Sequence, residues 1–203
     1  MKVACFIGGK GGSGKTTNAH STTHGLCMLG IPAAYVMTDN PKVRQLLSDE
    51  RRVYSIIDGT TVEKLEAAIA TAKQHNNGNG VLVIDGGGNR GAVDDLIASV
   101  ADAIVLPFTA DDDAVWVVYN EMNEFPKAWA LPTDWPTNPK AIKVDAGFIK
   151  KLKTTYPGRI LPPAYSTHSI RDLTLQSFNG TLLPPAQRYC REVARTVMKL
   201  LRD

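Results

Sequence analysis

The residues with the clearest chemistry form a glycine-rich run near the start of the chain. Residues 9–17 have the sequence GKGGSGKTT, and residues 9–16 fit the pattern GxxxxGKS/T directly after an apolar segment. The glycines allow a tight turn in which successive backbone N–H groups point inward, where they bind phosphate oxygens. Lys15 is predicted to contact the β- and γ-phosphates of a nucleotide, and the Thr16 hydroxyl to ligate Mg²⁺. The run therefore predicts a nucleotide site that includes Gly11, Gly12, Ser13 and Gly14.

An aspartate at the end of another apolar run is the second candidate. Asp85 closes the run VLVID at residues 81–85. An aspartate in this position is typical of the element that holds the hydration shell of Mg²⁺ beside a P-loop. Ligands of open α/β folds bind where the carboxyl ends of parallel strands meet. We therefore expect Asp85 to share the metal site with Thr16.

Short apolar runs rich in Val and Ile alternate with helical stretches, and these elements must position the site. Strands are predicted at Lys2–Gly8, Ala33–Met37, Gly80–Asp85 and Ala101–Pro107, with weaker candidates at Lys127–Leu131 and Arg159–Leu161. Helices are predicted at Lys15–Leu29, Val62–His75 and Asp113–Phe125, and prolines make Leu131–Pro139 an irregular loop. This alternation indicates an α/β fold, a single-domain P-loop NTPase over residues 1–203 with a mostly parallel sheet covered by helices on both faces.

The bulk composition is that of a globular protein. The chain has 203 residues, of which 43% are apolar and 21% charged, so disordered and fibrous classes are excluded. Its longest early apolar stretch, Val3 to Ile7, is too short for a signal peptide or a membrane span, so a cytoplasmic location is expected. The three cysteines are far apart, which argues against a disulfide framework or a zinc site, and we expect buried thiols. His20 and His24 share a helix face without a third ligand, and the three tryptophans are expected to pack in the core or in loops.

The last third of the chain is basic. Residues 1–125 hold 10 Lys/Arg against 15 Asp/Glu, whereas residues 126–203 hold 13 against 5. A closing helix at about 185–202 places five cations along one ridge: Arg188, Arg191, Arg195, Lys199 and Arg202. Such a ridge can follow a DNA backbone, but it can also be a solvated face or, less favoured, a membrane-binding face. Lys150, Lys151, Lys153 and Arg171 are candidates to extend the same surface.

The position of Lys10 inside the glycine-rich loop narrows the class. The run KGGSGKTT resembles the deviant Walker A box of the ParA/MinD family. By this resemblance Lys10 reaches across an ATP-bound dimer to the phosphates of the partner's nucleotide, Lys15 is the Walker lysine, Thr16 ligates magnesium and Thr17 contacts the α-phosphate. Two nucleotides held face to face carry a large negative charge, which additional cations offset.

The segment 35–41 resembles the family's switch Asp-x-Asp-Pro-Gln only in part. Met37 stands at the first aspartate, Asp39 at the second, Asn40 precedes the proline, and Lys42 replaces glutamine. The resemblance implies that Asp39 orients the attacking water, while the alternative is an Asx-turn residue. Residues 86–89 resemble the second switch.

The resemblance implies a function as well as a site. It implies an ATPase that uses ATP and Mg²⁺, dimerises when ATP is bound, binds non-specific DNA on the nucleoid, and is stimulated by a ParB-like or other adaptor protein. The cargo would be partitioned or positioned DNA or a protein assembly, as in small plasmid-partition ATPases. The alternatives are a MinD-like membrane-positioning or DNA-transfer accessory ATPase and a metabolic P-loop ligase of the same superfamily.

Overall fold

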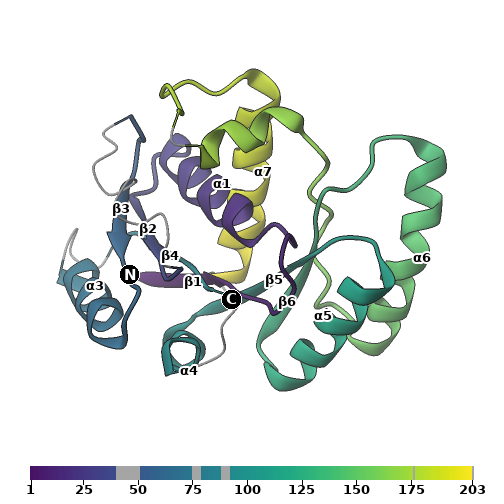
Figure 1. Ribbon diagram of the computed structural model, residues 1–203, viewed down its shortest axis with the longest axis horizontal. Coiled ribbons are helices and arrows are strands. Elements are labelled where there is room, and N and C mark those ends of the chain that lie inside the picture. Colours follow the sequence, from purple (N-terminus) through teal and green to yellow (C-terminus); the bar gives the residue numbers. More distant parts are fainter. Residues whose placement is uncertain (40–50, 75–78, 88–91, 176, 203) are drawn as a thin grey trace.

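The computed structural model describes residues 1–39, 51–74, 79–87, 92–175 and 177–202. Within these ranges one sheet has its strands in the order β3-β2-β4-β1-β5-β6, and every pairing is parallel (Figure 1). The strands are β1 (Lys2–Phe6), β2 (Ala33–Met37), β3 (Ser55–Asp58), β4 (Val81–Asp85), β5 (Ala103–Phe108) and β6 (Ala128–Pro132). The predicted α/β class is confirmed, and the predicted strands at the start, at 33–37 and at 80–85 are matched almost to the residue.

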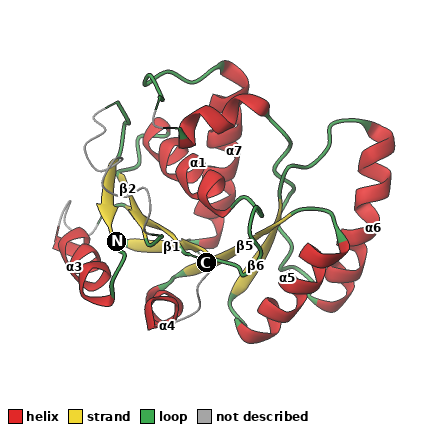
Figure 2. Ribbon diagram, in the orientation of Figure 1, coloured by secondary structure: helices red, strands yellow, loops and turns green. Residues whose placement is uncertain are grey.

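Helices cover both faces of the sheet (Figure 2). One face packs against α1 (Lys15–Met28), the 3₁₀ helix η2 (His168–Thr174) and α7 (Pro184–Leu200). The other face packs against α3 (Val62–Gln74), α4 (Ala92–Val100), α5 (Asp112–Glu124) and α6 (Pro139–Thr155). Because both faces are covered, successive residues of β1 enter different cores: Phe6 lies in the α1/α7 layer and Cys5 in the opposite one. The carboxyl ends of the central strands β1 and β4 are thereby fixed side by side.

Helices α1 and α7 approach closely at a glycine. A Cβ atom built on Gly25 of α1 would lie 2.0 Å from the carbonyl oxygen of Cys190 and 2.8 Å from the Cβ of Ala194, both on α7. No side chain other than hydrogen fits between the two backbones at this point. The close approach lets α7 bury an apolar face that includes Val193 and Val197 against α1 and the sheet.

Several predicted elements differ from the structure. β3, α4 and α6 were not predicted, and the segment predicted as a loop at 131–139 is shorter, since β6 ends at Pro132 and α6 begins at Pro139. Asn138 caps α6 by accepting a hydrogen bond from Lys140 N, and Pro139 fits the first turn because its missing N–H is not needed there. The weak strand candidate 159–161 was wrong, because it makes only an isolated bridge between Ile160 and Ala130.

The packing of the tryptophans and cysteines was predicted only in part. Trp135 is buried and Trp129 half-buried, but Trp116 is 63% exposed on helix α5, which contradicts its predicted packing in the core or in a loop. Cys5 and Cys190 are buried as expected, whereas Cys27 is only half-buried.

Candidate nucleotide-binding site

The glycine-rich loop connects the end of β1 to the first turn of α1. Gly12 and Gly14 have φ angles of 76° and 91°, which lie in the left-handed region that residues with a Cβ rarely adopt. Gly14 is the N-cap of α1 and has no side chain to bond the first N–H groups of the helix. Those groups are therefore available to a phosphate, and the helix dipole favours its negative charge there.

Contacts from distant segments hold this loop in place. Gly9 N donates to Oε1 of the buried Glu121 on α5 at 2.6 Å, and the Thr133 hydroxyl, after β6, donates to Ser13 O at 2.9 Å. Lys15 Nζ donates to Lys10 O at 2.8 Å across the loop. The loop is thus pre-organised by strands and helices that the motif itself does not include.

A cavity of about 670 Å³ opens beside the loop and brings the predicted site residues together. Lys15, Thr16, Asp39 and Asp85 all line it, together with Gly11, Gly12, Thr38, Thr60, Gly86, Gly87, Val93 and Asp94. Burial lowers the pKa of Lys15, whereas the negative charges of Asp85, Glu121 and Asp39 raise it. A cation surrounded by carboxylates on one side of an N–H-lined loop is suited to a phosphate accompanied by a divalent metal.

The two carboxylate oxygens of Asp85 differ in their hydrogen bonding. The Tyr35 hydroxyl on β2 donates to Asp85 Oδ2 at 2.6 Å, while Oδ1 is buried and has no hydrogen-bond partner in the described part of the chain. Burial raises the pKa of Asp85 to about 6, against the lowering effects of the Tyr35 hydrogen bond, the Thr16 hydroxyl and the Lys15 charge. A buried carboxylate oxygen without a partner fits a Mg²⁺ ion or one of its waters, so Asp85 and Thr16 would hold the metal. Bound Mg²⁺ would neutralise phosphate charge.

A buried aromatic cluster holds Tyr35 in place, and both histidines of α1, His20 and His24, belong to this cluster. The His20 ring on α1 stacks on Tyr35 with ring centroids 3.9 Å apart, and His20 Nδ1 lies 2.7 Å from the Tyr54 hydroxyl. Burial, with further contributions from Arg52 and His24, lowers the pKa of His20 to about 3, so the ring is neutral at pH 7. No cluster of three metal-ligating side chains occurs among the residues with described positions. His20 therefore supports Tyr35. The sequence did not reveal this role, because His20, Tyr35 and Tyr54 lie in different parts of the chain.

The hydroxyl of Tyr35 is expected to be needed for magnesium. Tyr35→Phe keeps the stack on His20 but frees Asp85 Oδ2, so the carboxylate loses its orientation and its pKa rises further above 6. We expect about tenfold more Mg²⁺ to be needed for tight nucleotide binding, because groups that orient metal ligands typically contribute 10–100-fold. The loss should grow as pH falls through the raised pKa, since the protonated carboxyl no longer attracts the cation.

A Mg²⁺ titration of nucleotide affinity at several pH values measures this effect. Tyr54→Phe is the matched control, because it removes a buried hydroxyl at the far end of the same stack without touching Asp85. Equal Mg²⁺ requirements for wild type and Tyr35→Phe would show that Asp85 is oriented by other contacts.

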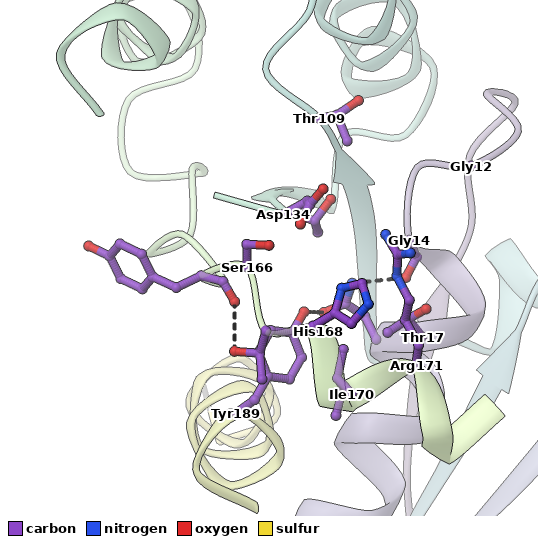
Figure 3. Close-up of a pocket in the computed structure, with 14 residues that line it drawn as sticks. Gly12, Gly14, Thr17, Thr109, Asp134, Ser166, His168, Ile170, Arg171 and Tyr189 are labelled. Carbon is purple, nitrogen blue, oxygen red and sulfur yellow. Dashed lines mark hydrogen bonds between the residues drawn. The ribbon is translucent and has the colours of Figure 1, made fainter. Parts of the chain in front are cut away.

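A second cavity, of about 210 Å³, lies on the other side of the glycine-rich loop (Figure 3). Gly12, Gly14 and Thr17 form one wall, and the loops after β5 and β6 contribute Thr109, Thr133 and Asp134. The remaining wall includes Tyr165, Ser166, Thr167, His168, Ile170, Arg171 and Tyr189. In Figure 3 His168 and Arg171 lie beside Gly14 and Thr17, with Asp134 and Ser166 across from them.

Hydrogen bonds hold one wall of this second cavity in place, and one residue of another wall, Asp134, has an uncommon backbone conformation. The Tyr189 hydroxyl on α7 donates to Asn18 Oδ1 at 2.9 Å, and Asn18 Nδ2 donates to Gly14 O at 2.8 Å. Asp134 has a φ of 51°, uncommon for a residue with a side chain. Polar groups at a cavity next to Thr17 suit the ribose and base of a nucleotide whose phosphates lie on the loop. Among the residues that line this cavity, the sequence had identified only Gly12, Gly14 and Thr17 as nucleotide contacts, and it had assigned Arg171 to the basic surface instead. The other lining residues become their neighbours only through the fold.

Lys10 points to the start of α5. Its ammonium pairs with Asp111, which is also the N-cap of α5 and accepts a hydrogen bond from Ala114 N at 2.9 Å. Partial burial raises the pKa of Asp111, but hydrogen bonds from Lys10, Thr109 and Ala114 N outweigh it and lower the pKa to about 2. The ion pair holds Lys10 half-exposed at the edge of the loop.

The basic ridge of the closing helix lies on the side of α7 away from its core contacts. Arg188, Arg195, Lys199 and Arg202 are exposed and Arg191 is half-buried. Lys150, Lys151 and Lys153 lie on α6, which packs on the opposite face of the sheet from α7. The expectation that these three lysines extend the ridge was therefore wrong. No helix in the described ranges is long and apolar enough to cross a lipid bilayer.

Comparisons with known proteins identify the fold. No protein-family profile and no curated protein sequence matches the chain. Among solved structures, the MinD cell division protein of Aquifex aeolicus is 16% identical with a TM-score of 0.71, covering 98% of this chain and 98% of that chain. A plasmid partition protein from Borrelia burgdorferi bound to AMPPNP is 14% identical with a TM-score of 0.69, again covering 98% of each chain.

A metabolic enzyme shares the same fold. Cobyrinic acid a,c-diamide synthase from Mycobacterium smegmatis with bound ADP and magnesium is 15% identical with a TM-score of 0.64, covering 100% of this chain and 96% of that chain. At such identities the likeness is one of fold, and it extends over the full length of each chain. The protein therefore has the fold of the ParA/MinD-type P-loop ATPases.

Proposed function

We propose that the chain is an ATP-dependent dimerising switch that positions or partitions DNA or another cargo. In this proposal ATP and Mg²⁺ occupy the cavity at Lys15, Thr16 and Asp85, and Asp39 orients the attacking water. ATP binding joins two subunits, the dimer binds non-specific DNA on the nucleoid, and a ParB-like or other adaptor stimulates hydrolysis and release.

The observation that carries the proposal is the placement of two lysines on one glycine-rich loop. Lys15 lines the cavity, whereas Lys10 is held outside it by Asp111, half-exposed at the molecular surface. These positions support the proposal that Lys15 contacts the subunit's own phosphates and that Lys10 contacts a charge from outside the subunit. A second subunit bound face to face supplies such a charge, since its nucleotide carries several negative charges.

Lys10→Ala is expected to bind nucleotide with near-normal affinity but to fail to dimerise with ATP. Light scattering with ADP and with a slowly hydrolysed ATP analogue measures the effect. The matched variant is Asp111→Asn, which keeps an N-cap for α5 but removes the carboxylate charge that holds Lys10. That variant should dimerise at lower analogue concentration than wild type. An ATP-dependent dimer of unchanged strength in Lys10→Ala would refute the cross-dimer role.

The ridge on α7 is expected to bind DNA when its charge is intact. Changing Arg191 and Arg195 together to Glu should remove binding to random-sequence duplex and flatten its salt dependence, because each lost phosphate contact removes about 0.9 from the logarithmic salt slope. Dimerisation doubles the ridge, so the ATP analogue should strengthen wild-type binding far more than ADP does.

Filter binding across a salt series measures the DNA affinity and its salt dependence, and circular dichroism verifies that each variant is folded. Lys150→Glu combined with Lys151→Glu is the control, since α6 packs on the other face of the sheet. A folded α7 variant with unchanged affinity and slope would make the ridge a solvated face.

Co-sedimentation with DNA and with anionic liposomes, each with ADP and with the slowly hydrolysed analogue, tests the function as a whole. Analogue-dependent sedimentation with DNA supports the proposal, and sedimentation with liposomes instead supports a membrane-positioning ATPase. A protein that sediments with neither and stays monomeric with the analogue would contradict the switch and favour a metabolic P-loop ligase.

A further inference from the structure

An apolar groove lies between α5 and α6, away from both nucleotide cavities. It has a volume of about 640 Å³ and is lined by Val115, Trp116, Tyr119, Val144, Gly147, Phe148, Leu152, Asp112 and Lys151. Figure 1 shows the two helices side by side at the edge of the molecule that ends in β6. Trp116 is 63% exposed and Val144 67% exposed, one on each side of the groove. Large side chains this exposed at a hollow surface are typical of an interaction site.

A chain of aromatic contacts supports Trp116 in this position. Its ring stacks on Tyr119 at an interplanar angle of 7°, and Tyr119 in turn packs against Tyr156, whose ring centroid lies 5.6 Å away. The Tyr156 hydroxyl lies within hydrogen-bond distance of two acceptors, Tyr119 O at 2.9 Å and Asn123 Oδ1 at 2.8 Å, which share its one hydrogen. A partner that binds on Trp116 therefore does not have to order it first, which favours a strong contact.

The charge around the groove indicates what binds there. Helix α6 carries five lysines, at 140, 143, 150, 151 and 153, against the single aspartate Asp145. All five are exposed, and none forms an ion pair within the described residues. Asp112 stands at the opposite rim, on α5. Of these lysines, Lys151 lines the groove itself, and the others add positive charge to the exposed surface of α6 outside it.

We propose that this groove docks an acidic amphipathic segment of a partner protein. A bulky apolar side chain of the segment packs between Trp116, Val144 and Phe148, and its carboxylates face Lys151 and the basic outer surface of α6. Two neighbouring helices accept such a segment as a helix in a groove, with its apolar side chains buried between them and its charges at the rim.

Docking on α5 reaches the nucleotide site through two contacts already present. Asp111, the N-cap of α5, pairs with Lys10, and Glu121 on the same helix accepts from Gly9 N. Trp116 lies on α5 between these two residues. A partner that shifts or stiffens α5 therefore changes the position of the P-loop. This consequence rests on the proposed function, whereas docking itself does not.

The test begins with a random peptide library displayed on phage and selected on the nucleotide-free protein. The enriched peptides should share a bulky apolar residue flanked by Asp or Glu. A fluorescein-labelled consensus peptide is then measured by anisotropy. Trp116→Ala should weaken its binding at least about tenfold, as for a central aromatic contact. Lys150→Glu with Lys151→Glu should weaken it similarly and remove its salt dependence, while the control Lys73→Glu on α3 leaves it unchanged.

Several results would overturn the docking proposal. One is a selection that yields no binder, and another is a peptide affinity that is equal in wild type and Trp116→Ala. A third is self-association of the protein that disappears in Trp116→Ala, since the groove would then bind a second copy. The last is binding of random duplex DNA or anionic vesicles that is lost when Trp116 or Lys151 is changed. A peptide that binds as expected but leaves ATP turnover unchanged supports the docking site and contradicts only its coupling to the proposed switch.

Discussion

Lys15→Ala is expected to abolish ATP turnover and to weaken ATP binding by at least about 100-fold. Lys15 Nζ lies at the cavity and already donates to Lys10 O, so its charge is held over the loop where the phosphates are expected. Charge-assisted hydrogen bonds are each worth roughly 1.5–3 kcal/mol, and the loss of contacts to two phosphates reaches this factor. In the variant, Asp85 also loses the positive charge that lowers its pKa, so the carboxylate side of the site becomes less favourable as well.

Isothermal titration with ATP and Mg²⁺ and a phosphate-release assay measure these two effects. Lys73→Ala, an exposed lysine in the last turn of α3, is the control for loss of one surface charge. Its affinity and turnover should equal those of wild type. A folded Lys15→Ala with wild-type affinity would place the nucleotide somewhere other than this loop.

The glycine-rich loop was predictable from the sequence because its chemistry is local. The turn, the N–H groups and the start of α1 are all encoded in consecutive residues, and the structure places Gly11, Gly12, Gly14, Lys15, Thr16 and Thr17 at the two cavities beside it. Asp85 was also predictable, since one apolar strand ending in an aspartate determines where that carboxylate lies. The parallel sheet followed from the alternation of strands and helices.

The partners of these residues were not predictable, because the fold brings them from other elements. Tyr35 is one residue of an ordinary apolar strand, and nothing in its neighbours indicates that its hydroxyl reaches Asp85, 50 positions later. Asp111 and Glu121 reach the loop across 101 and 112 positions. A hydrogen bond between distant positions leaves no periodic trace in a single sequence, so only the structure reveals which polar residues act together.

The missed elements have local explanations. β3 has only four residues at an edge of the sheet, too few for alternation to stand out. α6 follows a run of prolines and carries five lysines, and its mixed composition hides the few apolar positions, such as Ile149 and Leu152, that it buries. Trp116 was misplaced because aromatic residues are usually buried, and its exposure is a property of the α5/α6 surface rather than of its sequence context.

Gly25→Ala is expected to destabilise the protein by about 3 kcal/mol or more, although alanine is the better helix former by about 1 kcal/mol. The added methyl group would lie 2.0 Å from Cys190 O, and a backbone atom cannot move aside as a side chain does. The helices must separate, and their separation also disturbs the Tyr189 to Asn18 contact that ends at Gly14 O.

Thermal and urea denaturation test the effect of this methyl group, and Gly147→Ala is the matched control. Gly147 lies in the middle of α6, and nothing lies within 4 Å of a Cβ built there. The same substitution should therefore stabilise at that position by up to about 1 kcal/mol. For a chain of this size we expect Gly25→Ala to lower Tm by about 10 °C while Gly147→Ala raises it by a few degrees. Gly25 lines neither cavity, so any loss of ATP affinity in Gly25→Ala should come from the loss of stability and from the disturbed Tyr189 to Asn18 contact. If Gly25→Ala is as stable as Gly147→Ala, then α1 and α7 do not pack as closely at Gly25 as their backbones indicate.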